Sequence, residues 1–182
     1  MSTASFRLAF ICGGAKSGKS RFAQNLAESL PAPRLYMATG EALDDEMAAR
    51  IVRHQQDRGP EWQTLEEPRA LATVLRESDG HFGVILVDCL TLWLSNLLIR
   101  PETDLDGEKR QLIEVLHVMT TPVIMVTNEV GWGIVPANPL ARKFREAAGV
   151  LHQEIAALAD AAILVVSGLP LYLKGEHILK TN

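Results

Sequence analysis

The chain has only two cysteines, Cys12 and Cys89, which are too few for a disulfide framework. No Cys or His stands close to either at the spacing of a metal-ligand set, which argues against a structural zinc site. Each cysteine ends an apolar run of strand length. We expect both to be buried as small hydrophobic residues, and a redox pair across neighbouring strands is the alternative.

The sequence also lacks an apolar run of transmembrane length and an excess of positive charge. Residues 1–5 lack the charged start and the apolar stretch of a signal peptide, so we expect a cytoplasmic protein without a membrane span. The net charge is −4 and the basic residues are scattered, which argues against a nucleic-acid partner. A hydrophobic content of 47% over 182 residues predicts a single globular domain spanning 1–182.

One motif stands out against this ordinary background. The segment Gly13-Gly14-Ala15-Lys16-Ser17-Gly18-Lys19-Ser20 fits G-x-x-x-x-G-K-[ST], the phosphate-binding P-loop. An apolar run precedes it and an amphipathic helical pattern follows it, so backbone N–H groups and a helix N-terminus would converge on a bound polyphosphate. Lys19 would reach the β- and γ-phosphates, and the Ser20 hydroxyl would bind Mg²⁺. A glycine-rich turn with an incidental lysine is the structural alternative.

Apolar runs alternate with helical patterns along the whole chain. We predict strands at 6–12, 34–39, 83–89, 122–128 and 161–167, with a short sixth at 171–174. Helices fit at 18–30, 43–58, 67–78, 90–99, 106–119 and 138–159. Continuously apolar strands indicate burial on both faces, as in a parallel sheet. The predicted fold is therefore α/β: a doubly wound P-loop NTPase (RecA-like) with a mostly parallel sheet flanked by helices.

Ligands of such folds bind at the carboxyl ends of the strands. The residues at those ends are the P-loop, Thr39-Gly40-Glu41, Asp88 and Thr127-Asn128-Glu129. Asp88 ends an apolar strand as a Walker-B acid does and could hold Mg²⁺ directly or through water. The alternative is that Asp88 caps the helix that follows it.

The segment 131–139 is rich in glycine and proline and carries Trp132. At the active edge of the sheet such a loop suggests a substrate-binding element, with a purely structural connection as the competing interpretation. Asn138 and Pro139 then start a long helix. Its predicted buried stripe consists of Leu140, Phe144, Ala148, Leu151, Ile155 and Leu158.

Spacing alone does not identify a catalytic residue among the five histidines. His117 lies on an apolar helix face and is expected to pack there. His54 is distinguished by Arg58, one helical turn further on, which would keep the imidazole neutral and nucleophilic. An ordinary surface histidine is the alternative for His54.

Several motifs spread over the chain resemble one enzyme family. They are the P-loop, Asp44-Asp45-Glu46-Met47 with Arg50-Ile51-x-x-His54, Trp62-x-Thr64-x-Glu66-Glu67-Pro68, Asp88-Cys89-Leu90-Thr91 with Asn96-Leu97-Leu98, Thr127-Asn128-Glu129-Val130-Gly131 with Gly133-Ile134-Val135-Pro136, and Val165-Val166-Ser167-Gly168. The family is the bifunctional adenosylcobinamide kinase/adenosylcobinamide-phosphate guanylyltransferase of cobalamin synthesis. The resemblance covers essentially the whole chain.

The resemblance implies two reactions. ATP or GTP phosphorylates the aminopropanol hydroxyl of adenosylcobinamide, and GTP then transfers GMP through a histidine to adenosylcobinamide phosphate, which yields adenosylcobinamide-GDP and pyrophosphate. His54 matches the family's nucleophile. The resemblance further implies a homotrimer, with Mg²⁺ as cofactor. Besides the P-loop, the nucleotide contacts that it implies are Thr39, Gly40, Glu41, Gln55, Arg58, Glu66 and Asp88.

One position departs from the family pattern, because Lys16 stands where the resemblance leads us to expect Arg. Lysine can still neutralise a phosphate but lacks the bidentate fork of arginine. Two other functions compete with the resemblance. A simple P-loop small-molecule kinase would need no histidine nucleophile, and a regulatory GTPase would need an N-K-x-D motif, which the nearest strand end, Thr127-Asn128-Glu129-Val130, does not provide.

Overall fold

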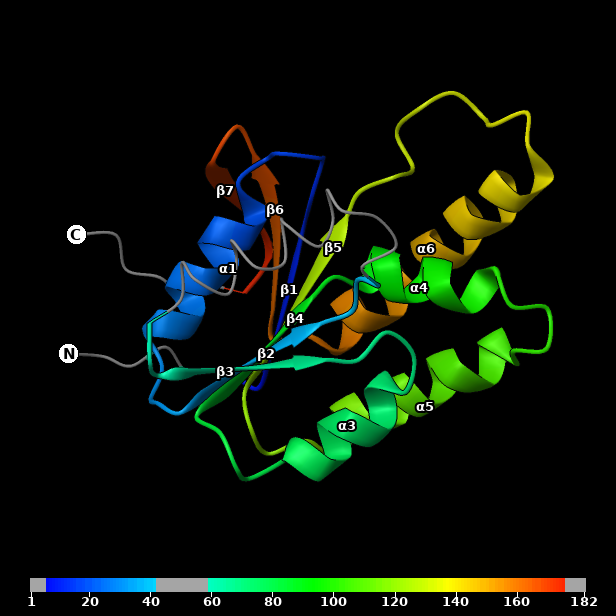
Figure 1. Ribbon diagram of the computed structural model, residues 1–182. Coiled ribbons are helices and arrows are strands. Elements are labelled where there is room, and N and C mark those ends of the chain that lie inside the picture. Colours follow the sequence, from blue (N-terminus) through cyan, green and yellow to red (C-terminus); the bar gives the residue numbers. More distant parts are fainter. Residues whose placement is uncertain (1–5, 42–58, 176–182) are drawn as a thin grey trace.

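A computed structural model describes residues 6–41 and 59–175 of the chain. Seven strands and five helices lie in this part (Figure 1). The strands are β1 (Leu8–Gly13), β2 (Arg34–Ala38), β3 (Trp62–Glu66), β4 (Val84–Asp88), β5 (Val123–Asn128), β6 (Ala161–Val166) and β7 (Leu169–Lys174). The helices are α1 (Lys19–Glu28), α3 (Leu71–Ser78), α4 (Leu90–Leu98), α5 (Leu105–Val118) and α6 (Pro139–Leu158).

All the strands form one sheet in the order β3-β2-β4-β5-β1-β6-β7. Every neighbouring pair is parallel except β6 and β7, which form an antiparallel hairpin at one edge. In this order β5 separates β1 from β4, and the register pairs Gly13 with Asn128 and Asp88 with Val126. The P-loop therefore emerges beside the carboxyl ends of β5 and β4.

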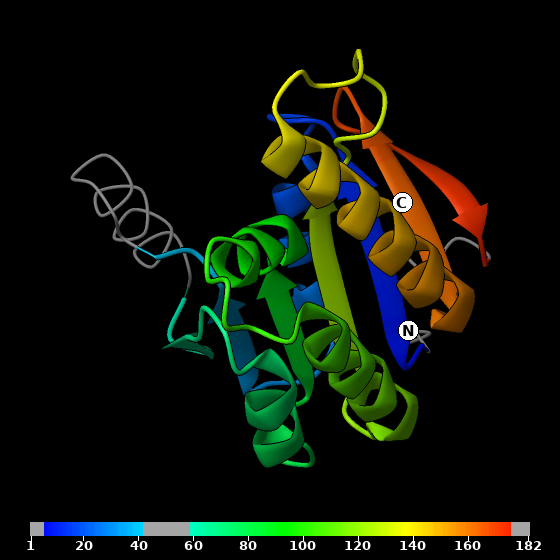
Figure 2. The same cartoon turned by 90° about the vertical axis from the view of Figure 1, so that its right-hand side faces the viewer.

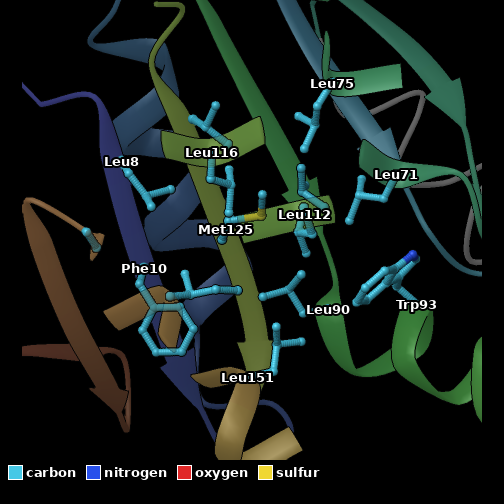
Figure 3. Packing of buried hydrophobic residues seen from close by; sticks show 14 of the residues in the cluster. Leu8, Phe10, Leu71, Leu75, Leu90, Trp93, Leu112, Leu116, Met125 and Leu151 are labelled. Carbon is cyan, nitrogen blue, oxygen red and sulfur yellow. The ribbon is translucent and has the colours of Figure 1, made fainter. Parts of the chain in front are cut away.

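The helices cover the two faces of the sheet unequally. Figures 1 and 2 show α1 on one face and α3, α4, α5 and α6 side by side on the other. Buried residues accordingly divide into two clusters, the larger of which joins those four helices to the sheet. In this larger cluster leucines of the helices pack against Phe10 and Met125 of the central strands (Figure 3). Both faces of β1, β4 and β5 are thus buried, which explains why these strands are continuously apolar.

The architecture predicted from the sequence is confirmed, with one strand missed. β3 was not expected because it lies at the edge of the sheet and most of its side chains are exposed. An edge strand with polar residues such as Gln63 and Thr64 lacks the continuous apolar signal of the central strands. β7 begins at Leu169 rather than at 171, and the predicted helix 43–58 lies outside the described residues.

Helix ends and faces bear out some predictions and correct others. The side-chain Oδ1 of Asn138 accepts hydrogen bonds from the backbone N–H groups of Leu140 and Ala141, which confirms Asn138 as the N-cap of α6. Leu140 itself is 49% exposed, so the buried stripe of α6 begins later than predicted. His117 is exposed near the end of α5, and the prediction that it packs in the core was wrong. No described helix is long and apolar enough to cross a membrane.

Asp160 fastens the start of β1 and should make stability depend on pH. Its carboxylate accepts backbone hydrogen bonds from Arg7 at 2.7 Å and Leu8 at 3.1 Å. Burial opposes ionisation, but these bonds outweigh it and lower the pKa of Asp160 below its ordinary value. A depressed folded-state pKa stabilises the protein above the ordinary carboxyl pKa, and this stabilisation is lost as the pH falls through the folded-state value.

We therefore expect Asp160→Asn to lower Tm at pH 7 by about 3 °C, and we expect this deficit to shrink as the pH falls below the ordinary carboxyl pKa of about 3.9. Thermal unfolding measured between pH 3 and pH 7 tests this. Asp106→Asn is the control, because the ion pair that Asp106 makes with Lys109 is exposed at the aspartate and contributes little. A constant difference between wild type and Asp160→Asn over the whole pH range would contradict the expectation.

Candidate functional site

The P-loop connects β1 to α1 through a backbone that only glycine permits at two positions. At Gly13 a Cβ would lie 2.5 Å from the carbonyl oxygen of Val165, and at Gly18 it would lie 3.1 Å from the Cα of Gly168. Gly18 also has a φ of 94°. The Gly168 N–H donates to the Ser17 carbonyl at 2.8 Å, so the β6–β7 turn supports the loop from outside.

Lys19 is the charged group of this loop. Its side chain is buried, 7% exposed, and its ammonium donates to the Gly14 carbonyl at 3.1 Å. Burial, followed by the charge of Glu129, raises the pKa of Cys12 to about 11, and Lys19 acts in the opposite direction. Burial also raises the pKa of Cys89, and the charge of Lys19 again acts to lower it. Lys19 therefore sits within electrostatic reach of the carboxyl ends of both β1 and β4, and both cysteines are buried, unpaired thiols as predicted.

Asp88 is half-buried at the end of β4, and its carboxylate accepts a hydrogen bond from the Tyr36 hydroxyl at 3.1 Å. The N-cap of α4 is Cys89, with no side-chain capping bond. The helix-capping alternative for Asp88 was therefore wrong. Asp88 ends a strand that pairs with β5, the strand that carries Asn128, and that lies one strand away from β1 and its P-loop, which is a position suited to a Walker-B acid.

Thr39 holds two strand ends together rather than facing solvent. Its fully buried hydroxyl donates to the Cys89 carbonyl at 2.7 Å and accepts from the Cys89 N–H at 2.8 Å. Asn96, also buried, donates to the carbonyls of Thr39 and Pro68. The Thr39 N–H also donates to the Asp88 carbonyl at 3.2 Å, so both the side chain and the backbone of Thr39 have internal partners, and its nucleotide contact stays a prediction from the resemblance.

Thr39→Val should therefore destabilise the fold without changing the shape of the side chain. Valine would leave the buried N–H of Cys89 without its partner, whereas the Cys89 carbonyl would keep its bonds from the N–H groups of Leu92 and Trp93, and we expect a cost of about 2 kcal/mol. Denaturant unfolding measures this loss. Thr73→Val on the exposed face of α3 is the matched control. Equal stability of the two variants would contradict the assigned role of Thr39.

Glu41 and Arg100 form an ion pair at the same edge, 3.1 Å apart with both side chains largely buried. Arg100 also donates to the Asn96 carbonyl. We did not anticipate Arg100, because its partner lies 59 positions away and no local spacing signals the pair. Glu41 thus has an internal partner, whereas Gly40 is partly exposed and Glu66 is exposed at the end of β3.

The carboxyl end of β5 carries a second polar network. Thr127 is fully buried, and its hydroxyl lies 2.8 Å from Nε2 of His152. Burial lowers the pKa of His152, while the charge of Glu129 acts in the opposite direction. The Asn128 amide donates to the Thr91 hydroxyl at 3.1 Å. The sequence did not single out His152, because its partner Thr127 lies 25 positions away.

The strand ends and the P-loop border a cavity of about 340 Å³. Its lining joins the P-loop to the β5–α6 connection and to β6, and consists of Gly14, Ala15, Lys16, Ser17, Glu129, Trp132, Leu164, Val165, Val166 and Ser167. His54, Gln55 and Arg58 lie outside the described residues. The structure thus brings the P-loop, Asp88 and the 129–132 segment to one edge of the sheet. An anion cradle next to a carboxylate can bind a metal-bound polyphosphate.

The family model for cobinamide kinase/cobinamide phosphate guanyltransferase matches residues 9–173. The chain belongs to this family. It is 47% identical over 169 residues to the bifunctional adenosylcobalamin biosynthesis protein CobP of Pseudomonas aeruginosa, covering 92% of this chain and 98% of the relative. The protein CobU of Salmonella typhimurium, with the same description, is 42% identical over 178 residues, covering 90% of this chain and 98% of the relative.

Solved structures confirm the P-loop NTPase fold of this family member. The flagellar accessory protein FlaH from Methanocaldococcus jannaschii has a TM-score of 0.53 at 15% identity, covering 94% of this chain and 80% of that one. The RadB recombinase has a TM-score of 0.51 at 17% identity, covering 86% and 73%. At these identities the likeness concerns the fold alone.

Proposed function

We propose that this chain is a bifunctional enzyme of cobalamin biosynthesis that phosphorylates adenosylcobinamide and then attaches GMP to the phosphate. The observation that carries the proposal is a family match over 9–173 that includes an intact P-loop, with Lys19 buried at the ends of β1 and β4. A shared phosphate cradle serves both reactions because each begins with a bound nucleoside triphosphate.

In the kinase step, the aminopropanol oxygen of adenosylcobinamide attacks the γ-phosphorus of ATP or GTP. The bond from the γ-phosphorus to the bridging oxygen breaks, the nucleoside diphosphate leaves, and the hydroxyl proton is released. Lys19 stabilises the charge that develops on the β- and γ-phosphate oxygens, and the N–H groups of 14–19 hold them in place. This part of the proposal uses only the P-loop.

In the guanylyl step, an imidazole nitrogen of His54 attacks the α-phosphorus of GTP and pyrophosphate leaves. A phosphate oxygen of adenosylcobinamide phosphate then attacks the same phosphorus, the N–P bond breaks, and adenosylcobinamide-GDP is released. The two displacements split one difficult transfer into two easier ones. Arg58 would stabilise charge on the α-phosphate. The role of His54 rests on its place in the family motif.

The residues at the site fit Mg²⁺. Ser20 supplies a hydroxyl beside the buried Lys19, and Asp88 supplies a carboxylate at the end of β4. Within residues 6–41 and 59–175, no group of three His, Cys, Asp or Glu side chains could hold a metal ion alone. Magnesium binds phosphates through one or two protein oxygens, so this small donor set suits it. When bound, Mg²⁺ would neutralise charge on the phosphates.

The nucleotide contacts beyond the P-loop stay predictions. They are Thr39, Gly40, Glu41, Gln55, Arg58, Glu66 and Asp88. A cytoplasmic location, where ATP and GTP are supplied, is likewise a prediction.

A homotrimer is the expected assembly. Its support in the described residues is β7, an edge strand on which Leu169, Leu171 and Leu173 are 72%, 56% and 61% exposed. An apolar edge of this kind is usually covered by another chain. Analytical ultracentrifugation measures the mass of the assembly.

Incubation with GTP labelled at the α- or the γ-phosphate, with and without adenosylcobinamide, tests the proposed function. We expect α label to become bound to the protein without a corrinoid, and γ label to appear in adenosylcobinamide phosphate when the corrinoid is present. Transfer of γ label with no protein-bound α label would instead indicate a simple P-loop kinase. Transfer of neither label to protein or corrinoid would contradict both activities.

A further inference from the structure

The connection between β5 and α6 exposes three large apolar side chains. Trp132, Ile134 and Val135 are 77%, 96% and 67% exposed. Figure 2 shows this connection projecting beyond the carboxyl ends of the strands. A contiguous exposed apolar group of this size is unusual on a protein surface and marks a binding site.

The backbone of this connection, residues 131–137, is held by side chains of α6. Arg145 donates to the carbonyls of Gly133 and Ile134 at 3.0 and 3.2 Å. Arg142 donates to the carbonyls of Pro136 and Ala137 at 3.0 and 2.6 Å. These two arginines of α6 therefore fix the loop. Hydrogen bonds to its carbonyls keep the apolar side chains turned outward in a prepared arrangement.

The loop is continuous with the phosphate cradle. Trp132 lines the same 340 Å³ cavity as Lys16 and Ser17, and Leu164 and Val166 also belong to its lining. A cavity of this size accommodates a small molecule or the tail of a larger one. The macrocycle of a corrinoid with its amide side chains is too large for it, so only the aminopropanol arm of such an acceptor would enter.

From this continuity we infer that the 131–137 loop is the platform for the acceptor's macrocycle, with Trp132 stacked on or against its apolar edge and Ile134 and Val135 extending the contact. The inference rests on the proposed function, which supplies the acceptor. A corrin is a broad, nearly flat ring bearing methyl groups, and aromatic and branched aliphatic side chains match it. The platform would hold the ring outside while its hydroxyl arm reaches the phosphates.

A second copy of this chain is the competing occupant. β7 is the better candidate for that role, because among the described strands it lies at the edge of the sheet and exposes three leucines. The 131–137 loop offers no strand edge, and its backbone carbonyls are already used by the two arginines. Through Trp132 this loop borders the same cavity as the P-loop.

The test compares Trp132→Ala with wild type in two assays. Equilibrium dialysis, read by the visible absorbance of adenosylcobinamide, gives Kd, and kinase assays give KM for adenosylcobinamide and for ATP. We expect Kd and KM for the corrinoid to rise about tenfold or more, because a central aromatic contact dominates such interfaces. The KM for ATP should stay within about twofold of wild type. Val118→Ala is the control. Val118 is also exposed, at 67%, but it precedes β5 and so lies near the amino ends of the strands, away from the 131–137 loop.

A second variant, Arg145→Ala, leaves every apolar side chain in place and removes the bonds to Gly133 and Ile134. It should raise KM for adenosylcobinamide in the same direction, which identifies Arg145 as a positioning residue. An unchanged Kd and KM in Trp132→Ala would overturn the inference, as would a smaller assembly in ultracentrifugation with corrinoid affinity intact. If wild type itself neither binds nor phosphorylates adenosylcobinamide, the proposed function fails instead.

Discussion

Lys19→Ala is expected to lower phosphoryl transfer and protein guanylylation together, each by about 100- to 1,000-fold, because one ammonium serves both reactions. In the kinase step Lys19 faces charge that builds on the β- and γ-phosphates. In the guanylyl step it faces the same atoms as part of the leaving pyrophosphate. Initial rates with γ-labelled ATP and α-labelled GTP measure the two losses in parallel.

The matched control for this variant is Lys174→Ala. Lys174 also donates its ammonium to backbone carbonyls, those of Ala156 and Ala157, but at the far end of β7 from the P-loop. Removing it reproduces the loss of a lysine–carbonyl bond and should leave both rates at the wild-type level. If Lys19→Ala lost kinase activity but kept full guanylylation, the two reactions would use separate nucleotide sites.

The fold was readable from the sequence where burial is two-sided. β1, β4 and β5 lie between two layers of helices, so nearly every residue of each strand is buried. A short, continuously apolar run of this kind predicts a strand of a parallel sheet. β3 was missed because it lies at an edge with one neighbour, β2, and most of its side chains are exposed. The signal of a strand depends on its place in the sheet, which local sequence does not reveal.

The site was readable where chemistry is local. The P-loop residues are consecutive and Asp88 ends an apolar run, so a local pattern in the sequence predicts both. Arg100, Asn96 and His152 were missed because each acts on a partner that is distant in sequence: Glu41, Thr39 and Thr127. Such pairs form only once the strands are ordered, and no single-sequence pattern encodes that order.

His54→Ala is expected to abolish labelling of the protein by α-labelled GTP while part of the kinase activity survives. Phosphoryl transfer to a hydroxyl needs the P-loop but no protein nucleophile, whereas GMP transfer as proposed passes through an N–P bond. The measurement is protein-bound α label after denaturation, beside kinase rates with γ-labelled ATP. His81→Ala is the control, because His81 is exposed in the turn before β4 and so lies near the amino ends of the strands, opposite the P-loop.

The chemistry of the bond alone does not decide this assignment. A phosphoramidate is acid-labile and alkali-stable whether its nitrogen belongs to histidine or to lysine, and Lys19 also lies at the phosphates under the proposed function. The variants separate the two, because a lysine adduct would persist in His54→Ala. Label retained there would overturn the role of His54. Label lost there but formed slowly in Lys19→Ala would place the nucleophile on His54 and the charge stabilisation on Lys19.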